Sequence, residues 1–292
     1  MLLMQLKPAL TRAIEWLDEA RQGSPRMNAE MLMMFVLGCD RAYLYAHPER
    51  ELTADEQERF EEAVARRAEG FPSQYIVGHQ EFWGLDFIVN PAVLIPRPET
   101  EHAVETVLAL AEQMEFSGAA GRPKLIDVGT GSGAIALALA KELPKAEVHA
   151  CDLSAEALEV ARINAARLEL TDRVNFNKSD VLDSVVRDGS FDFVVSNPPY
   201  VALREADKVQ DVVKRFEPTM AVFAGEHGLD VIRRLIPQAQ ETLRVGGYLV
   251  MEIGFSMSEA VMGLLGDWDD VHAVPDLAGI PRVVVAQNKT PK

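Results

Sequence analysis

The chain has 292 residues, of which 48% are hydrophobic and 25% charged, and its net charge at pH 7 is −16. These values are typical of a globular protein with room for a small domain and a medium one. No run approaches the roughly 18–20 apolar residues that cross a bilayer, so no membrane protein is predicted. The acidic balance argues against a surface that grips duplex phosphates and favours a basic protein partner.

Residues 1–75 are predicted to form a small helical domain. Ser24-Pro25 is typical of a helix N-cap followed by Pro at the first helical position, and Gly38 closes that helix. Thr53 and Glu56 have the spacing of a capping box. We assign this domain a role in substrate docking, by its position alone.

Residues 76–98 contain several prolines and glycines, and two apolar runs flank Gly84, which predicts a β-hairpin linker. From residue 99 to residue 292, strands are predicted to alternate with helices. This alternation is typical of a mostly parallel sheet covered on both faces. The strands are expected at residues 124–128, 147–151, 174–177, 191–196 and 247–253, with a closing antiparallel pair at 271–274 and 282–286. Ligands of such sheets bind beyond the carboxyl ends of the strands.

A glycine-rich turn follows the first of these strands and opens a helix. Its candidate binding residues are Asp127, Gly129, Thr130, Gly131, Ser132 and Gly133. Glycines let the backbone approach a ligand closely, and Asp152, one strand later, is placed to accept both hydroxyls of a ribose. The same spacing fits the dinucleotide fingerprint of a dehydrogenase. The turn therefore predicts a nucleoside-containing cofactor without deciding which one.

Asp127 favours S-adenosylmethionine as this cofactor. A carboxylate just before the glycines would repel a pyrophosphate, but it suits a ligand that carries an ammonium and a sulfonium. After the third strand, Asp180 is expected to accept the adenine amino group while Val181 packs on the ring. A plain loop acid at Asp180 fits the sequence nearly as well.

Asn197-Pro198-Pro199-Tyr200 follows the fourth strand, and its two prolines end the strand and stiffen the loop. The Asn197 side-chain oxygen and the Pro198 carbonyl can accept the two hydrogens of an NH2 group, on which Tyr200 can stack. A conjugated nitrogen resists activation, since breaking amide conjugation costs about 18–20 kcal/mol. A site for it must hold and aim the nitrogen. The loop therefore predicts methylation of a planar, conjugated NH2 group.

Nearly the whole chain resembles the release-factor glutamine methyltransferases. The resemblance is carried by Tyr75-Ile-x-Gly78-x-x-Glu81-Phe82-x-Gly84, by LIPRPETE at residues 94–101, by the motifs above, and by Glu252-Ile-Gly254. It implies a Rossmann-like class I S-adenosylmethionine-dependent domain with a mostly parallel seven-stranded sheet. The implied reaction is methylation of the side-chain nitrogen, N5, of the glutamine in the Gly-Gly-Gln motif of class I peptide chain release factors.

The resemblance also implies roles for individual residues. Asn197 and Pro198 would accept the glutamine amide, and Tyr200 would pack against it, which makes these three the candidate catalytic residues. Pro199, Arg97 and Glu99 are assigned to the substrate site as well, and Asn197 also to the cofactor site.

Other functions remain open at this stage. An N6-adenine or N4-cytosine DNA methyltransferase has an almost identical loop, but the net charge and the lack of a basic recognition domain count against it. A glutamine methyltransferase acting on a ribosomal protein fits less well at residues 97–101. A dehydrogenase or a non-enzymatic scaffold leaves the Asn197 loop unexplained.

The cellular setting is predicted from residue usage. The six histidines include no pair at metal-ligand spacing, so no metal is expected. Cys39 and Cys151 are far apart, and two unpaired thiols are typical of the reducing cytosol. We expect a cytoplasmic monomer that binds neither membranes nor DNA directly.

Overall fold

The structure, a computed structural model, describes residues 4–114 and 121–289. Contacts along the chain divide it into two compact units. The helical unit comprises Met1–His79 and Gln210–Phe216, and the sheet unit comprises Gln80–Val209 and Glu217–Lys292. None of the helices in the described ranges is long and apolar enough to cross a membrane.

The helical unit is built around an apolar core that includes Leu17, Leu32 and Phe60. Its helices are α1 (Leu6–Glu19), α2 (Pro25–Leu37), α3 (Arg41–Ala46), α4 (Ala54–Ala68), α5 (Ser73–Val77) and α9 (Asp211–Phe216). The capping box that Thr53 and Glu56 predict at the start of α4 is confirmed.

Ser24 stands at the predicted N-cap position of α2, but its side chain makes no cap hydrogen bond. Its backbone is left-handed with φ of 50°, whereas a capping residue usually has an extended backbone. Asn28 contacts the same end of the helix differently, because its Nδ2 donates to the carbonyls of Gly23 (2.6 Å) and Ser24 (3.1 Å). Pro25 does occupy the first turn of α2, and Gly38 ends that helix in the left-handed conformation.

The short helix α9 belongs to the helical unit although it lies more than 130 residues further along the chain than α5. The Phe216 ring packs edge-on against Phe71, with the ring centroids 5.0 Å apart. Arg215 Nη1 donates to the carbonyl of Glu69 at 3.3 Å. The chain therefore leaves the sheet unit after Val209 and returns to it at Glu217.

The predicted hairpin is present as β1 (His79–Phe82) and β2 (Leu85–Ile88). Its two turn residues, Trp83 and Gly84, both have positive φ, of 55° and 66°. This is the conformation of a two-residue turn whose twist matches that of the flanking strands.

The sheet unit contains a seven-stranded sheet with the order β5-β4-β3-β6-β7-β9-β8. The first five strands in this order are parallel, and β9 is antiparallel to both β7 and β8. This confirms the predicted fold class. The strands are β3 (Lys124–Val128), β4 (Glu147–Asp152), β5 (Val174–Lys178), β6 (Phe191–Ser196), β7 (Leu243–Glu252), β8 (Asp269–Pro275) and β9 (Pro281–Gln287).

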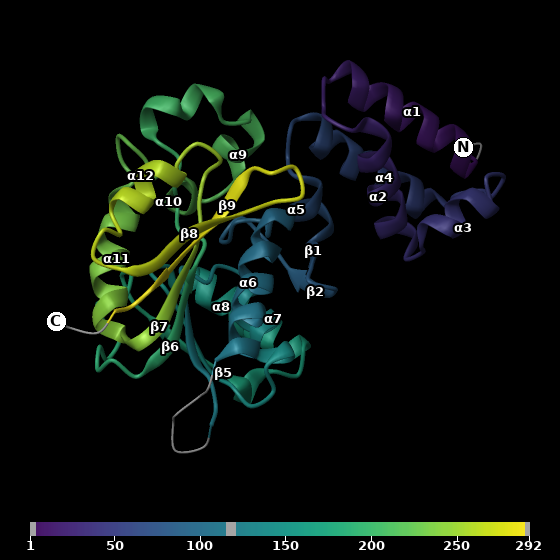
Figure 1. Ribbon diagram of the computed structural model, residues 1–292. Coiled ribbons are helices and arrows are strands. Elements are labelled where there is room, and N and C mark those ends of the chain that lie inside the picture. The colour runs from purple at the N-terminus through teal and green to yellow at the C-terminus, as the bar shows by residue number, and fades with distance from the viewer. Residues whose placement is uncertain (1–3, 115–120, 290–292) are drawn as a thin grey trace. The chain divides into compact units, whose positions relative to one another are not determined.

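Helices cover both faces of this sheet (Figure 1). One face packs against α6 (Glu101–Gln113), α7 (Ala134–Glu142) and α8 (Ala155–Arg167), and the other against α11 (Asp230–Thr242) and α12 (Ser258–Gly263). Two apolar clusters result, because the central strands are buried on both sides, as parallel strands are. The remaining elements are α10 (Thr219–Val222) and the 3-10 turns η1 (Pro98–Thr100), η2 (Thr171–Arg173) and η3 (Leu203–Lys208).

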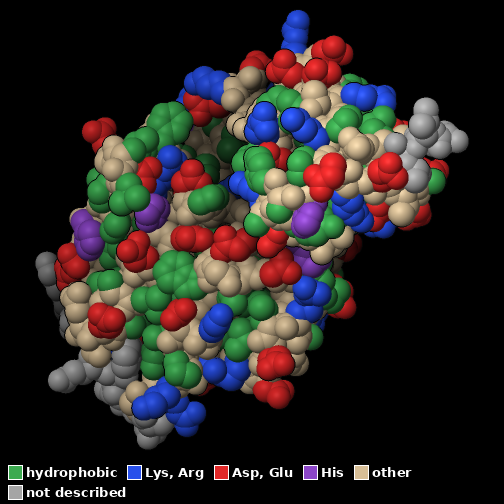
Figure 2. All heavy atoms as spheres, turned by 90° about the vertical axis from the view of Figure 1, so that its right-hand side faces the viewer, with side chains coloured by type: hydrophobic (Ala, Val, Ile, Leu, Met, Phe, Trp, Pro, Cys, Tyr) green, Lys and Arg blue, Asp and Glu red, His purple; other side chains and the backbone are tan. Residues whose placement is uncertain are grey.

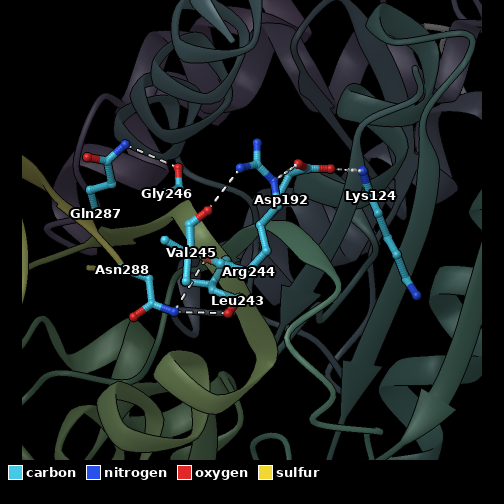
Figure 3. A network of polar contacts seen from close by, with 8 residues as sticks. All are labelled: Lys124, Asp192, Leu243, Arg244, Val245, Gly246, Gln287 and Asn288. Carbon is cyan, nitrogen blue, oxygen red and sulfur yellow. Dashed lines mark hydrogen bonds and ion pairs between the residues drawn. The ribbon is translucent and has the colours of Figure 1, made fainter. Parts of the chain in front are cut away.

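A polar network closes the sheet at the amino ends of β3 and β6 (Figure 3). Asp192 accepts hydrogen bonds from the Lys124 backbone N–H (2.8 Å) and from Arg244 Nε (2.5 Å). Nearby, Asn288 Nδ2 donates to the carbonyl of Leu243 at 2.9 Å. Since ligands of parallel sheets bind at the carboxyl ends, this network is structural.

Candidate active site

The glycine turn after β3 is held from within by Asp127. Its Oδ2 accepts hydrogen bonds from Thr130 Oγ1 (2.6 Å) and from the backbone N–H of Ala136 (3.2 Å). Burial raises the pKa of Asp127 to about 7. Its other oxygen, Oδ1, is buried and has no hydrogen-bond partner among the described residues.

Gly133 is required by the packing of α7 against α8. Its φ is +85°, and an added Cβ would lie 3.0 Å from Leu137 Cδ1 and 3.2 Å from Ala161 Cβ. The glycine therefore sets the angle at which α7 leaves the turn.

Gly133→Ala is expected to lower the free energy of unfolding of the sheet unit. The left-handed backbone costs about 1–2 kcal/mol for a residue with a Cβ, and the two close contacts add about 1–3 kcal/mol. Gly279→Ala is the matched control, because Gly279 has a φ of +79° and open space around it. Urea unfolding measures both variants, and an equal loss of stability in the two would contradict the packing role.

A cavity of about 340 Å³ opens beside this turn. Its size falls within the range of small-molecule sites, about 300–1,000 Å³. Of the residues predicted from the sequence, those that line it are Gly129, Gly131, Asp152, Asp180, Val181, Asn197, Pro198 and Pro199. Those outside its lining are Asp127, Thr130, Ser132, Gly133, Arg97, Glu99 and Tyr200.

Asp152 stands at the end of β4 with its carboxylate fixed by two backbone groups. Its Oδ2 accepts from the Gly131 N–H at 2.9 Å, and its Oδ1 accepts from the Ser154 N–H at 2.8 Å. Burial raises the pKa of Asp152, and these hydrogen bonds oppose the rise. Each carboxylate oxygen retains a lone pair that can accept a hydroxyl.

Asp180 and Val181 follow β5 on the same side of the cavity. Asp180 forms an ion pair with Arg234, whose Nη2 lies 2.7 Å from Oδ2. Val181 is buried and has a φ of +52°, which is rare for a β-branched residue and costs on the order of 1–3 kcal/mol. Cys151 Sγ donates to the Val181 carbonyl at 3.3 Å, and this contact helps to hold the strained backbone.

The loop after β6 is held by a chain of side-chain hydrogen bonds. Asn197 Nδ2 donates to Thr100 Oγ1 at 3.0 Å, and Thr100 Oγ1 donates to Glu252 Oε2 at 2.5 Å. Tyr200 donates its hydroxyl to the other oxygen, Glu252 Oε1, at 3.4 Å. Sequence reasoning missed this arrangement, although Thr100 and Glu252 both lie in motifs that it had singled out.

Glu252 is almost completely buried, with 2% of its surface exposed. Burial raises its pKa to about 7, although the bonds from Thr100 and Tyr200 lower it. Burial also raises the pKa of Tyr200, with Glu252 adding to the rise, so its hydroxyl keeps its proton and acts as a donor. Gly254, two residues further on, leaves space for the tyrosine ring, because a Cβ there would lie 3.2 Å from Tyr200 Cδ2.

Arg97 is held by a buried carboxylate. Its Nη2 lies 2.5 Å from Glu217 Oε1, and Glu217 Oε2 accepts the Ile95 N–H at 3.2 Å. Glu217 is the residue at which the chain re-enters the sheet unit. Arg97 therefore has a structural partner, and its contact with substrate stays a prediction, as does that of Glu99.

The part of the chain that the structure describes contains no candidate metal site. No group of three or more His, Cys, Asp or Glu side chains there is arranged to hold an ion.

Comparison with known proteins assigns the chain to a family. The PrmC N-terminal domain family matches residues 8–78, and the methyltransferase small domain family matches residues 106–219. A release factor glutamine methyltransferase from Koribacter versatilis is 55% identical over 98% of this chain and 100% of its own length. The chain belongs to the release factor glutamine methyltransferase family. A relative of the same description from Moorella thermoacetica is 42% identical over 98% of this chain and 99% of its own length.

Family membership confirms the predicted enzyme class and cofactor. The chain is an S-adenosylmethionine-dependent methyltransferase. The fold has a solved counterpart in the hMettl16 catalytic domain, with a TM-score of 0.56 and 17% identity over 86% of this chain and 93% of that one. At that identity the likeness concerns the fold alone.

Proposed function

We propose that this methyltransferase modifies N5 of the glutamine in the Gly-Gly-Gln motif of class I peptide chain release factors. The observation that carries the proposal is the loop at residues 197–200, which lies at the carboxyl end of β6 and whose residues 197–199 line the cavity beside the glycine turn. Relatives named for release factor glutamine methylation match this chain over nearly its full length.

The cavity residues suit S-adenosylmethionine, which when bound supplies an electrophilic methyl group on its sulfonium. Asp152 would accept the ribose hydroxyls with the lone pairs that its backbone partners leave free. Val181 would pack on the adenine, and Asp180 would accept the adenine amino group while it remains paired with Arg234.

The glycine turn would hold the rest of the cofactor. Gly129 and Gly131 would lie against it at the cavity wall. The buried Asp127 Oδ1, which has no hydrogen-bond partner among the described residues, would face the positive charge of its amino acid end. Thr130, Ser132 and Gly133 would support the turn from outside the cavity.

The acceptor amide would be held by the loop. Asn197 Oδ1 and the Pro198 carbonyl would each accept one N–H, and Tyr200 would pack against the amide plane. Both prolines fix φ, so little loop entropy is lost when the amide binds. Pro199, Arg97 and Glu99 complete the proposed substrate site.

Charge supports a protein acceptor over duplex DNA. The net charge is −16, and the face in Figure 2 carries acidic and basic side chains interspersed among apolar ones. A protein that extrudes a base from a duplex grips the phosphates with clustered Lys and Arg. A ribosomal-protein glutamine is the remaining alternative acceptor.

We also propose how the chain is organised and where it acts. Residues 1–75 would dock the release factor, residues 76–98 would link, and residues 99–292 would perform catalysis, in a cytoplasmic monomer. The ends of the chain at 1–3 and 290–292, and residues 115–120, lie outside the described residues.

Transfer of labelled methyl from the cofactor tests the acceptor directly. Four substrates are compared: a release factor, its variant with the Gly-Gly-Gln glutamine changed to alanine, a ribosomal protein preparation and duplex DNA. Label is expected on the unmodified release factor only. Label on DNA alone, or on the glutamine-less variant to the same extent, would overturn the proposal.

A further inference from the structure

A single buried carboxylate holds both ends of the Asn197 loop. Glu252 Oε2 accepts the Thr100 hydroxyl, which in turn accepts Asn197 Nδ2, and Glu252 Oε1 accepts the Tyr200 hydroxyl. Thr100 is 4% exposed and Glu252 2%. Neither residue lines the cofactor cavity, so both contact the loop from outside the cavity.

We infer that Glu252 and Thr100 are positioning residues that fix which end of the Asn197 amide faces the acceptor nitrogen. The inference rests on the proposed function, in which Asn197 Oδ1 accepts an N–H of the acceptor amide. Neither residue touches the acceptor or the cofactor.

The number of protons in the chain of hydrogen bonds determines its direction. A threonine hydroxyl has one proton, and an ionised carboxylate can only accept. Thr100 must therefore give its proton to Glu252, and its oxygen can then only accept. Asn197 must turn its NH2 toward Thr100, as the structure has it, which leaves Oδ1 available to the acceptor.

Protonation of Glu252 reverses this direction. A neutral carboxyl can donate to Thr100 Oγ1, and the threonine proton then becomes available to Asn197 Oδ1. The turned amide would present its NH2 to the acceptor, and two N–H donors facing each other cannot bond. The loop would keep its backbone position but lose its ability to hold the amide.

Groups on three segments of the chain shift the pKa of Glu252. Glu99 on η1 raises the pKa of Glu252, and Arg282 on β9 lowers it. Tyr200, on the loop after β6, donates a hydrogen bond that also lowers it. Burial outweighs these effects and places the pKa of Glu252 at about 7. Turnover at saturating cofactor and acceptor is therefore expected to fall as the pH drops through 7.

Glu252→Gln removes the charge and keeps the shape. Its amide can accept from Tyr200 and donate to Thr100, which locks the chain in the reversed direction. We expect kcat to lie on the order of 100-fold below the wild-type value above pH 7 and to stay at that low level at lower pH, as for other losses of positioning. We expect the acid limb of the kcat profile, its fall as the pH drops through 7, to vanish. The Kd for cofactor is expected to stay within about twofold of the wild-type value, since Glu252 does not line the cavity. Thr100→Val is expected to lower kcat and to remove its acid limb in the same way. Thr100→Ser keeps the hydroxyl and is expected to retain turnover.

Asp192→Asn is the matched control, because Asp192 is also a buried carboxylate with two donors but lies at the opposite ends of the strands (Figure 3). It is expected to lower stability and to leave the pH profile of kcat unchanged. If Glu252→Gln retains wild-type kcat, or loses kcat but keeps the acid limb, the positioning role is wrong.

A second measurement does not depend on which acceptor is methylated. The side-chain amide resonances of Asn197, assigned by their absence in Asn197→Asp, are followed between pH 6 and 8.5 on the cofactor-bound enzyme. A one-proton transition near pH 7 that Glu252→Gln abolishes is expected. Resonances that do not titrate would overturn the inference even if release factor is the substrate. If the transition is observed but the enzyme methylates a different acceptor, only the proposed function is contradicted.

Discussion

Asn197→Ala is expected to keep cofactor binding and to lose turnover by on the order of 100-fold to 1,000-fold, as when a hydrogen-bonding group that acts in the transition state is removed. The truncated side chain still leaves the Pro198 carbonyl and the Tyr200 ring in the loop. It removes one of the two acceptors for the amide, and it removes the group that Thr100 orients. The measurements are cofactor Kd by calorimetry and methyl transfer at saturating substrates.

The role of Asn197 is tested by comparing the change in cofactor Kd with the change in turnover. Asn197 lines the cofactor cavity, so a change of a few-fold in Kd is compatible with its role. A variant with normal turnover would remove the role assigned to the loop. A variant that loses cofactor binding and turnover equally would make Asn197 a cofactor residue only.

Asp152→Ala should give the second large effect, this time on cofactor binding. Hydrogen bonds to a charged group contribute about 1.5–3 kcal/mol each, so losing those to the ribose hydroxyls raises Kd by at least about tenfold to 100-fold. The Gly131 N–H that Asp152 accepts also loses its partner, which loosens the turn. Cofactor Kd measured by calorimetry checks this.

Asp172→Ala serves as the control for Asp152, because Asp172 is an exposed acid on η2 outside the cavity lining. It changes the net charge equally and is expected to leave Kd unchanged. Equal effects of the two substitutions would mean that overall charge, and not the Asp152 carboxylate, governs cofactor binding.

The sheet and the glycine turn were predictable because both depend on local sequence. Strands buried on two faces are apolar runs, as at β3 and β6, and the predicted bounds of β3, β4, β5 and β6 agree with the structure to within a residue or two. A turn with three left-handed residues needs glycines, and Gly129, Gly131 and Gly133 stand where φ is positive. Neither feature requires knowledge of distant contacts.

The hydrogen-bond chain behind the loop was not predictable in the same way. Thr100 and Glu252 are 152 residues apart and meet only because η1 lies beside the end of β7. Motif resemblance marked both segments without indicating what either does. The pairing of Arg97 with Glu217 spans 120 residues and was missed for the same reason.

Ser24 occupies the N-cap position that the sequence predicts, but the capping hydrogen bond does not form. A capping side chain accepts a backbone N–H from a residue whose backbone is extended, whereas Ser24 has a φ of 50°. Residue type at a helix end predicts the position of the cap and not the backbone conformation that the hydrogen bond requires.

The placement of α9 bears on how the enzyme can be dissected. The chain crosses between the units at residues 209–210 and 216–217, in addition to the crossing at residues 79–80. A gene fragment that begins at residue 80 would encode a six-residue helix whose Phe216 had packed on a ring that is no longer encoded. The unpaired ring would favour self-association, so residues 1–79 are not expected to be exchangeable as a cassette unless residues 210–216 are replaced with them.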